Sequence, residues 1–230
     1  HHGFDYFLAA LCGTIDYYYH NEPTGERVLY ENLRQVRRDR YMTDLITDGA
    51  VEFLRKQPKD EPIFLYLPFN APSAPFQHPD RKPEKPKVSH KWDSKDWQKG
   101  SRATLRAIIE RLDQGVGRIL RTLTESGRAD DALVIFCSDN GPVLNDDYID
   151  GSIKMLGDHD PNGPYRGGKY NVYEGGTRTP FISRMPGTIP AGVSDRIVCT
   201  IDLPASLAAL AGQPDDAFVD SEDLLEAILG

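Results

Sequence analysis

Apolar residues recur at helical spacing in two segments of the chain, 41–53 and 105–123. Residues three and four positions apart share one face of a helix, so this pattern predicts two amphipathic helices. Thr43 stands where a side-chain cap would begin the first helix. Ser126 and Gly127 end the second, because glycine readily adopts the left-handed conformation that follows a helix.

Two continuous apolar runs, 63–67 and 133–137, have the length of strands. A run that is apolar at every position predicts a strand buried on both faces, as in a parallel sheet. Shorter strands are expected at 179–183 and 197–201, followed by a helix at 204–211. Strands that alternate with helices in this way predict an α/β domain with a largely parallel sheet.

The composition is that of an ordinary globular domain of 230 residues, with 39% hydrophobic and 27% charged residues. The formal net charge of −8 argues against a nucleic-acid surface or a polybasic membrane patch, but it allows a local basic pocket. No apolar stretch approaches the roughly 18 residues that span a membrane. The three cysteines, Cys12, Cys137 and Cys199, are widely spaced, which predicts small buried residues rather than a disulfide framework or zinc site.

Polar residues follow directly after the second apolar run, beginning with Asp139 and Asn140. In open α/β sheets, ligands bind beyond the carboxyl ends of the strands. A carboxylate beside an amide carbonyl suits a hard cation such as Ca²⁺ or Mg²⁺, which prefers oxygen ligands. Calcium takes six to eight of them, so such a site needs further ligands from outside this pair. Alternatively, Asn140 and Gly141 form a turn, since both residue types tolerate positive φ.

A second cluster places Arg166 and Lys169 on either side of two glycines. Glycines beside cations let a backbone approach an anion closely while the lysine supplies a point charge. Solvated surface turns have the same composition, so both interpretations remain open. His159 lies between two aspartates and is a candidate for the site. Two further histidines lie in the long proline-rich loop 72–99: His78 and His90.

The order of these motifs resembles the sulfatase family. The run 133–141 is similar to the family's strand that ends in a calcium-binding Asp-Asn pair. The block 166–181 contains Arg-Gly-Gly-Lys and then Tyr-Glu-Gly-Gly-Thr-Arg-Thr-Pro-Phe, and it is similar to the motif whose lysine contacts the sulfate group. Further similar motifs extend over almost the whole chain: 3–7, 13–17, 112–117, 185–187 and 201–204. Each is common singly, whereas their order is specific.

The resemblance implies a fold and a set of roles. The fold is α/β: an alkaline-phosphatase-like sandwich with a mostly parallel central sheet flanked by helices. Asp139 and Asn140 would bind Ca²⁺ or Mg²⁺, and Lys169 would be the catalytic residue that contacts the sulfate or its leaving oxygen. The resemblance makes three further residues candidates for substrate binding: Arg166, Ser73 and His159.

Two departures from the family pattern stand out. The family's Ala-Pro-His-x-Pro block is here 71–75, with Ser73 in place of the histidine. Serine can donate a hydrogen bond but cannot carry a positive charge, and His78 is a candidate substitute. The sequence also lacks the family's Asp-Asp metal pair, its Lys-Trp-His block and its Cys-x-Pro/Ala-x-Arg motif, which is oxidised to formylglycine. By this comparison, residues 1–230 are a single catalytic domain that is incomplete at both ends, and its first two histidines are native sequence.

The parent protein is accordingly expected to hydrolyse a small-molecule or carbohydrate sulfate ester through a formylglycine nucleophile. That residue would be made by a formylglycine-generating or sulfatase-maturing enzyme. Residues 1–230 alone are expected to be inactive and poorly soluble. The family implies an exported protein, whether periplasmic, extracellular or lysosomal, without a membrane span or a nucleic-acid partner. Two alternatives stay open: a phosphodiesterase or phosphonate hydrolase of the same superfamily, and a degenerate non-catalytic binding module.

Overall fold

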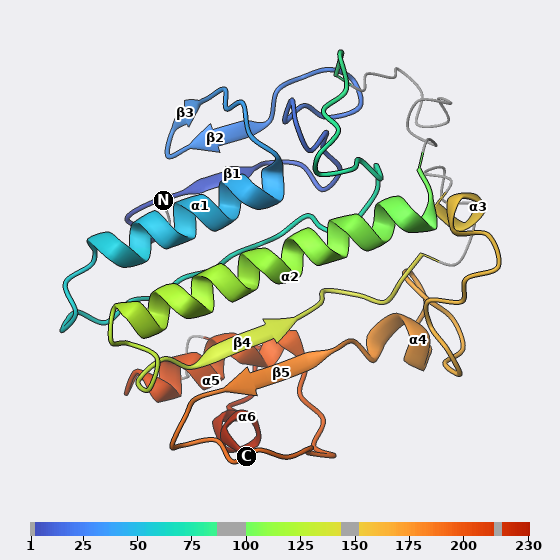
Figure 1. Cartoon of the computed structure of the whole chain (residues 1–230). Coiled ribbons are helices and arrows are strands. Elements are labelled where there is room, and N and C mark those ends of the chain that lie inside the picture. The colour runs from blue at the N-terminus through green and yellow to red at the C-terminus, as the bar shows by residue number, and fades with distance from the viewer. Residues whose placement is uncertain (1–2, 87–99, 144–151, 214–217) are drawn as a thin grey trace. The chain divides into compact units, whose positions relative to one another are not determined.

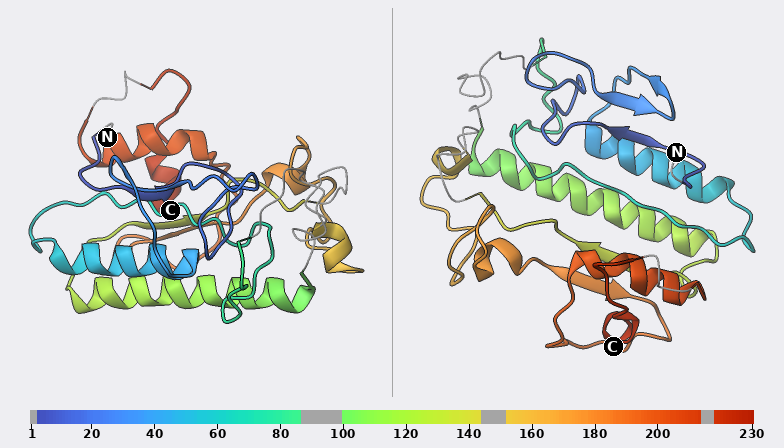
Figure 2. Two further views of the ribbon diagram at one scale, coloured as in Figure 1. Left: turned by 90° about the horizontal axis from the view of Figure 1, so that it is seen from above. Right: turned by 180° about the vertical axis from the view of Figure 1, so that it is seen from behind.

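The computed structural model describes residues 3–86, 100–143, 152–213 and 218–230. The chain divides into two compact units, each built from two stretches of sequence. The first unit comprises His1–Ser126 and Val143–Gly163, and the second comprises Gly127–Pro142 and Pro164–Gly230. Figures 1 and 2 show the elements of each unit.

The first unit joins a small antiparallel sheet to two long helices. Its sheet has the order β1-β2-β3, with strands Leu8–Ala10, Leu29–Glu31 and Arg34–Gln35. Its helices are α1 (Met42–Lys56), α2 (Arg102–Glu125) and the short α3 (Ser152–Leu156). Helices α1 and α2 lie side by side in both views (Figures 1 and 2).

The two long helices confirm the predictions made from their apolar spacing. Ser101 caps α2, its side chain accepting a hydrogen bond from the Thr104 N–H, and Gly127 follows the helix with a φ of 67°. The cap predicted for α1 is wrong. Tyr41 occupies the N-cap position, and the Thr43 hydroxyl is buried and makes no hydrogen bond among the described residues. Thr43 lies one residue inside the helix, where its neighbours exclude water.

The core of the first unit is aromatic as well as aliphatic. Tyr17 and Tyr41 stack with 5.0 Å between ring centroids, and Tyr18 meets Tyr41 edge-on at 5.1 Å. Ile15, Leu29, Ile108 and Leu156 belong to the same buried cluster. The segment 15–20 therefore serves as a central packing element for α1, α2 and the loop that follows residue 70.

The second unit is organised around an antiparallel pair of strands. Strand β4 (Val134–Cys137) pairs with β5 (Phe181–Arg184), with Cys137 opposite Phe181. Its helices are α4 (Glu174–Thr177), the 3-10 turn η1 (Thr200–Asp202), α5 (Leu203–Leu210) and α6 (Leu225–Leu229). The Ser183 hydroxyl donates to the Ile228 carbonyl over 2.7 Å, which ties α6 to the strand pair. Helix α5 confirms the helix predicted at 204–211.

Several strand predictions differ from the structure. Within the described residues both sheets are antiparallel, and the expected parallel pairing is not among their ladders. The segment 63–67 is not a strand; Phe64 and Tyr66 are 62% and 67% exposed, so the expected burial on both faces is wrong. An apolar run gives a strand only where a neighbouring segment supplies hydrogen bonds, and no described segment pairs with this one. Phe136 in β4 is likewise 40% exposed.

The remaining corrections concern the loops and the cysteines. The segment 197–201 is not a strand, because the Asp202 N–H donates to the Cys199 carbonyl and winds the chain into η1. Cys199 is exposed and the other two cysteines are only partly buried, contrary to the prediction of three buried thiols. Of the long loop predicted at 72–99, residues 87–99, including His90, lie outside the described residues. In the described parts of the chain, no helix combines the length and the apolarity needed to cross a bilayer.

Candidate functional site

The turn that follows β4 is hydrogen-bonded to the glycine-rich loop 166–178 of the same unit. The Gly141 N–H donates to the Gly176 carbonyl over 2.9 Å, and the Lys169 N–H donates to the Pro142 carbonyl over 2.7 Å. These bonds bridge about thirty residues of sequence. They bring the backbone that carries Asp139 and Asn140 against the backbone that carries Lys169.

Glycine is required where these two segments meet. A Cβ at Gly141 would lie 1.8 Å from the Gly175 carbonyl oxygen, and one at Gly176 would lie 2.2 Å from the Asn171 carbonyl oxygen. No side chain fits at either distance. Gly141 and Asn140 are not among the residues with positive φ, so the turn alternative, which relied on positive φ, does not explain them. The close approach of two backbones explains Gly141 instead.

Asp139 and Asn140 present oxygen atoms at the end of β4. The Asp139 side chain is exposed, and the Asn140 side chain is partly buried. The Asn140 amide nitrogen donates to the Gly141 carbonyl over 3.0 Å, which leaves its oxygen as the atom that can bind a cation. Burial, and then the negative charge of Asp139, raises the pKa of the Cys137 thiol above its ordinary value. A cation bound there would offset this charge.

The donor set therefore fits a hard cation in type but not in number. One carboxylate and one amide oxygen suit Ca²⁺ or Mg²⁺, which need more ligands than two. Among the residues that the structure describes, no group of three or more His, Cys, Asp or Glu side chains gathers around a common centre. An ion held by Asp139 and Asn140 would need further oxygen ligands to complete its coordination.

Arg166 and Lys169 differ in how they are held. The Arg166 guanidinium lies over the Tyr173 ring, 3.9 Å from its centroid, and its Nη2 donates to the Tyr173 hydroxyl over 3.0 Å. The Lys169 side chain is partly buried, with Nζ 5.5 Å from the centroid of the Tyr170 ring. Tyr170 has a φ of 75°, a left-handed conformation in which a tyrosine is strained. Strained backbone of this kind is concentrated at functional sites.

The other predicted substrate-binding residues, Ser73 and His159, belong to the first unit. Both side chains are exposed. The Ser73 backbone is fixed, since its carbonyl accepts a bond from the Tyr17 hydroxyl over 2.8 Å and its N–H donates to the Asn70 carbonyl over 2.9 Å. The His159 N–H donates to the Leu156 carbonyl over 3.4 Å. In His78, the ring Nδ1 accepts a bond from the Asp80 N–H over 3.2 Å.

A buried hydrogen-bond network beneath the Ser73 loop was missed by sequence reasoning. The carboxylate of Asp16 is fully buried and accepts bonds from the Tyr18 and Tyr19 N–H groups, over 2.8 and 2.9 Å, and from Gln77 Nε2 over 2.9 Å. Gln77 Oε1 in turn accepts from the Tyr17 N–H over 2.7 Å. Burial raises the pKa of the Tyr17 phenol, so it stays a hydrogen-bond donor. We call Asp16, Tyr17 and Gln77 the Asp16 clamp.

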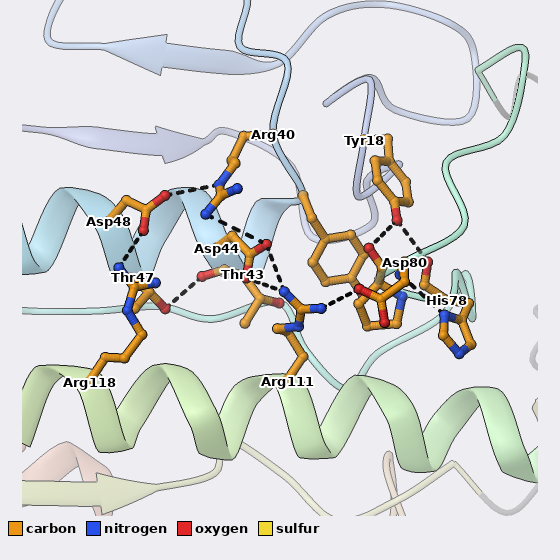
Figure 3. A network of polar contacts seen from close by, with 12 residues as sticks. Tyr18, Arg40, Thr43, Asp44, Thr47, Asp48, His78, Asp80, Arg111 and Arg118 are labelled. Carbon is orange, nitrogen blue, oxygen red and sulfur yellow. Dashed lines mark hydrogen bonds and ion pairs between the residues drawn. The ribbon is translucent and has the colours of Figure 1, made fainter.

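A second polar network joins α1, α2 and the loop after Gln77 (Figure 3). Arg111 of α2 contacts both oxygens of Asp44 of α1, over 3.3 and 3.2 Å, and also pairs with Asp80 in the loop. Burial lowers the pKa of Arg111, but the two carboxylates outweigh it, and the pKa lies above its ordinary value. Arg118, two turns after Arg111 on α2, pairs over 2.7 Å with Asp48, one turn after Asp44 on α1. Nothing in the local sequence signals these pairs, because their partners are 31 to 70 residues apart.

Comparisons with known proteins give a consistent result. The family model described as Sulfatase matches residues 1–213. An N-acetylgalactosamine-6-O-sulfatase of Bacteroides thetaiotaomicron is 38% identical over 195 residues, which are 84% of this chain and 35% of that protein. The human N-acetylgalactosamine-6-sulfatase is 30% identical over 82% of this chain and 32% of its own length. The crystal structure of Ps i-CgsB in complex with k-i-k-neocarrahexaose matches with a TM-score of 0.74 and 27% identity, covering 98% of this chain and 50% of that one.

These comparisons confirm the α/β, alkaline-phosphatase-like fold class implied by the resemblance. The chain spans about a third of the length of the curated relatives that it matches, and half of the matched structure.

Proposed function

The chain belongs to the sulfatase family, and on that premise we propose that the protein carrying it is a sulfuric ester hydrolase. One observation in this chain supports the proposal most strongly. The backbone bonds from Lys169 to Pro142 and from Gly141 to Gly176 join the candidate metal ligands to the candidate sulfate-contacting lysine. A sulfate ester needs both, because its oxygens carry negative charge that rises at the leaving oxygen as the S–O bond breaks.

We assign complementary roles to the residues of this loop pair. Asp139 and Asn140 would hold Ca²⁺ or Mg²⁺, which supplies Lewis-acid polarisation of the sulfate oxygens when bound. Lys169 places an ammonium group at the sulfate or its leaving oxygen, where it stabilises developing negative charge. Arg166 is held in a fixed position by Tyr173, which orients its guanidinium for an oxyanion without further ordering.

Ser73 and His159 are further substrate-binding candidates in the first unit. Tyr17 and Asn70 fix the Ser73 backbone, so its exposed hydroxyl is presented from a rigid loop and can donate a hydrogen bond to a sulfate oxygen. His78 is the candidate for the positive charge that Ser73 lacks. We also propose that both units belong to one catalytic domain.

The nucleophile is not among the residues of this chain. Formylglycine would supply it in the complete protein, made there by a maturation enzyme. None of the three cysteines lies in the Cys-x-Pro/Ala-x-Arg pattern, so none of them fits the residue that is oxidised to formylglycine. We therefore propose that residues 1–230 alone release no sulfate over multiple turnovers. Repeated turnover of an aryl sulfate by residues 1–230 alone would contradict that proposal.

Sulfated carbohydrates are the proposed substrate class, and an exported location is proposed with it. Relatives named for N-acetylgalactosamine-6-sulfate and a relative solved with a carrageenan oligosaccharide support the substrate class. Two alternatives have testable consequences. A phosphodiesterase or phosphonate hydrolase would turn over phosphorus esters instead, and a degenerate binding module would bind sulfated sugars without releasing sulfate.

The experiment that tests the proposal replaces Lys169 in the complete protein. Lys169→Met keeps the length of the side chain and removes its charge, and it should lower kcat/KM for 4-methylumbelliferyl sulfate by about 10²- to 10³-fold, the cost of losing one oxyanion-stabilising group. Lys59→Met is the matched control, because Lys59 is exposed in the segment after α1. Equal activities of the two variants would show that Lys169 does not contribute to catalysis.

A further inference from the structure

A cationic cavity of about 550 Å³ opens within the first unit. Three segments form its walls: residues 18–27, the residues 37–39 that follow β3, and the loop 82–86. The lining includes two tyrosines and four cationic side chains: Tyr18, Tyr19, Arg27, Arg37, Arg38 and Lys82. The volume falls within the roughly 300–1,000 Å³ typical of small-molecule sites.

The charge of this cavity is opposite to that of the chain. Four of its lining side chains are cationic and one, Asp39, is acidic, whereas the whole chain has a formal charge of −8. Lys82 pairs with Asp39, and Arg38 pairs with Glu31 at the rim. Arg27 and Arg37 form no ion pair within the described part of the chain. Arg27 and Arg37 are both solvent-exposed, so their guanidinium groups are available to an anion that enters the cavity.

The walls are held in place by hydrogen bonds that do not involve a ligand. The Tyr19 hydroxyl donates to the Pro83 carbonyl over 2.7 Å, and the Tyr18 hydroxyl donates to the His78 carbonyl over 2.8 Å. A backbone bridge between Asn21 and Arg27 closes the hairpin 21–27. A preformed cavity of this kind binds a ligand without first ordering its own loops.

Aromatic and guanidinium groups in one cavity indicate a sugar that carries an oxyanion. Lys82 Nζ lies 5.3 Å from the centroid of the Tyr19 ring, so cation and aromatic face are adjacent. The guanidinium groups of Arg27 and Arg37 can each bind sulfate or carboxylate oxygens through paired N–H donors. The hydroxyl of Tyr19 is already bonded to Pro83, so its ring contributes an apolar surface, which suits the C–H face of a pyranose. A nucleic acid is disfavoured, because its binding surfaces need many more cations than two.

We propose that this cavity binds an acidic sugar residue of an anionic oligosaccharide, with its sulfate or carboxylate between Arg27 and Arg37 and its ring against Tyr19. The proposal does not rest on the proposed hydrolysis, since it concerns binding and is measured without turnover. It adds a binding site for oligosaccharide to the sulfatase-type site, and it would let the protein discriminate acidic glycans from neutral ones.

The test measures binding of a chondroitin sulfate hexasaccharide to the complete protein by calorimetry, with EDTA present and with sulfate release monitored. Arg27→Gln/Arg37→Gln should weaken binding about tenfold or more at 0.1 M salt. Arg34→Gln/Arg121→Gln removes the same two charges at exposed sites outside the cavity and should change the affinity less than about twofold. Arg27→Lys/Arg37→Lys keeps the charge and should recover part of the affinity, and unchanged melting temperatures exclude misfolding.

Three outcomes would overturn the proposal. Equal weakening in the cavity and control variants would show a long-range field rather than a site. Equal binding of neutral maltohexaose would remove the anion from recognition. If inorganic sulfate bound at Arg27 and Arg37 as tightly as the hexasaccharide, the sugar ring would have no part in recognition. Failure of the proposed hydrolase function gives a different result: no sulfate is released from any substrate, while the hexasaccharide still binds in an Arg27- and Arg37-dependent manner.

Discussion

Replacement of Asp16 tests whether its buried carboxylate organises the segment beneath the Ser73 loop. The carboxylate accepts hydrogen bonds from the N–H groups of Tyr18 and Tyr19 and from Gln77 Nε2. Asp16→Ala leaves all three donors buried without an acceptor. Each such donor costs about 1–3 kcal/mol, so the expected loss is about 3–6 kcal/mol once some water enters the space.

Asp16→Asn separates hydrogen-bond geometry from side-chain size. Its amide oxygen can still accept from the two tyrosine N–H groups, whereas its amide nitrogen would face the Gln77 nitrogen, donor against donor. Gln77 cannot turn over to correct this, because its oxygen accepts from the Tyr17 N–H. One bond is lost and two become neutral, so the expected cost is about 1–3 kcal/mol, clearly less than for the alanine variant.

Urea unfolding of the complete protein, followed by tyrosine fluorescence, measures both changes. Asp113→Ala is the control, since Asp113 is exposed on α2, and it should stay within about 0.5 kcal/mol of wild type. The same variants should raise KM more than they lower kcat, because Tyr17 also holds the Ser73 carbonyl. A cost below about 0.5 kcal/mol for Asp16→Ala, or equal costs for both variants, would refute the reasoning.

Two further predictions concern packing and pH. Gly141→Ala should destabilise the second unit by about 2–3 kcal/mol, because its Cβ would meet the Gly175 carbonyl oxygen at 1.8 Å. Thermal melting measures this effect against the control Gly192→Ala, whose Cβ meets nothing within 4 Å. Equal melting temperatures of the two variants would contradict the prediction. Burial lowers the pKa of His20 below its ordinary value of 6.5, so the unfolded chain binds the proton more readily. Stability should fall as pH drops below about 6.5, and His20→Gln should flatten that slope in urea titrations at pH 5 and 7; an unchanged slope would show that other groups cause it.

The helices could be read from the sequence, whereas the strand pairing could not. The apolar spacing of 105–123 predicts α2 (Arg102–Glu125) because a helix is stabilised by neighbours three and four residues away. Strand β4 pairs with a segment about 45 residues later, and no local pattern encodes that partner. The run 63–67 is the opposite case, because it has the composition of a strand but pairs with no other strand among the described residues.

The candidate site was likewise only partly visible in the sequence. Asp139, Asn140 and Lys169 were identified by the order of their motifs. The bonds that join them depend on a close backbone approach that only Gly141 and Gly176 permit, and a glycine in a sequence does not reveal what it approaches. The Asp16 clamp could have been suspected, because an aspartate followed by three tyrosines in an apolar setting needs buried hydrogen-bond donors.

The ratio of kcat/KM for an aryl sulfate to that for a phosphodiester tests the central claim most directly. It should be measured on the complete protein after maturation, with Ca²⁺ present, for wild type and for Asp139→Ala. We predict that the sulfate ester is the better substrate by at least about tenfold, and that Asp139→Ala lowers sulfate turnover by about 10²-fold or more while the protein remains folded. Preference for the phosphodiester, or full sulfatase activity in Asp139→Ala, would contradict the claim.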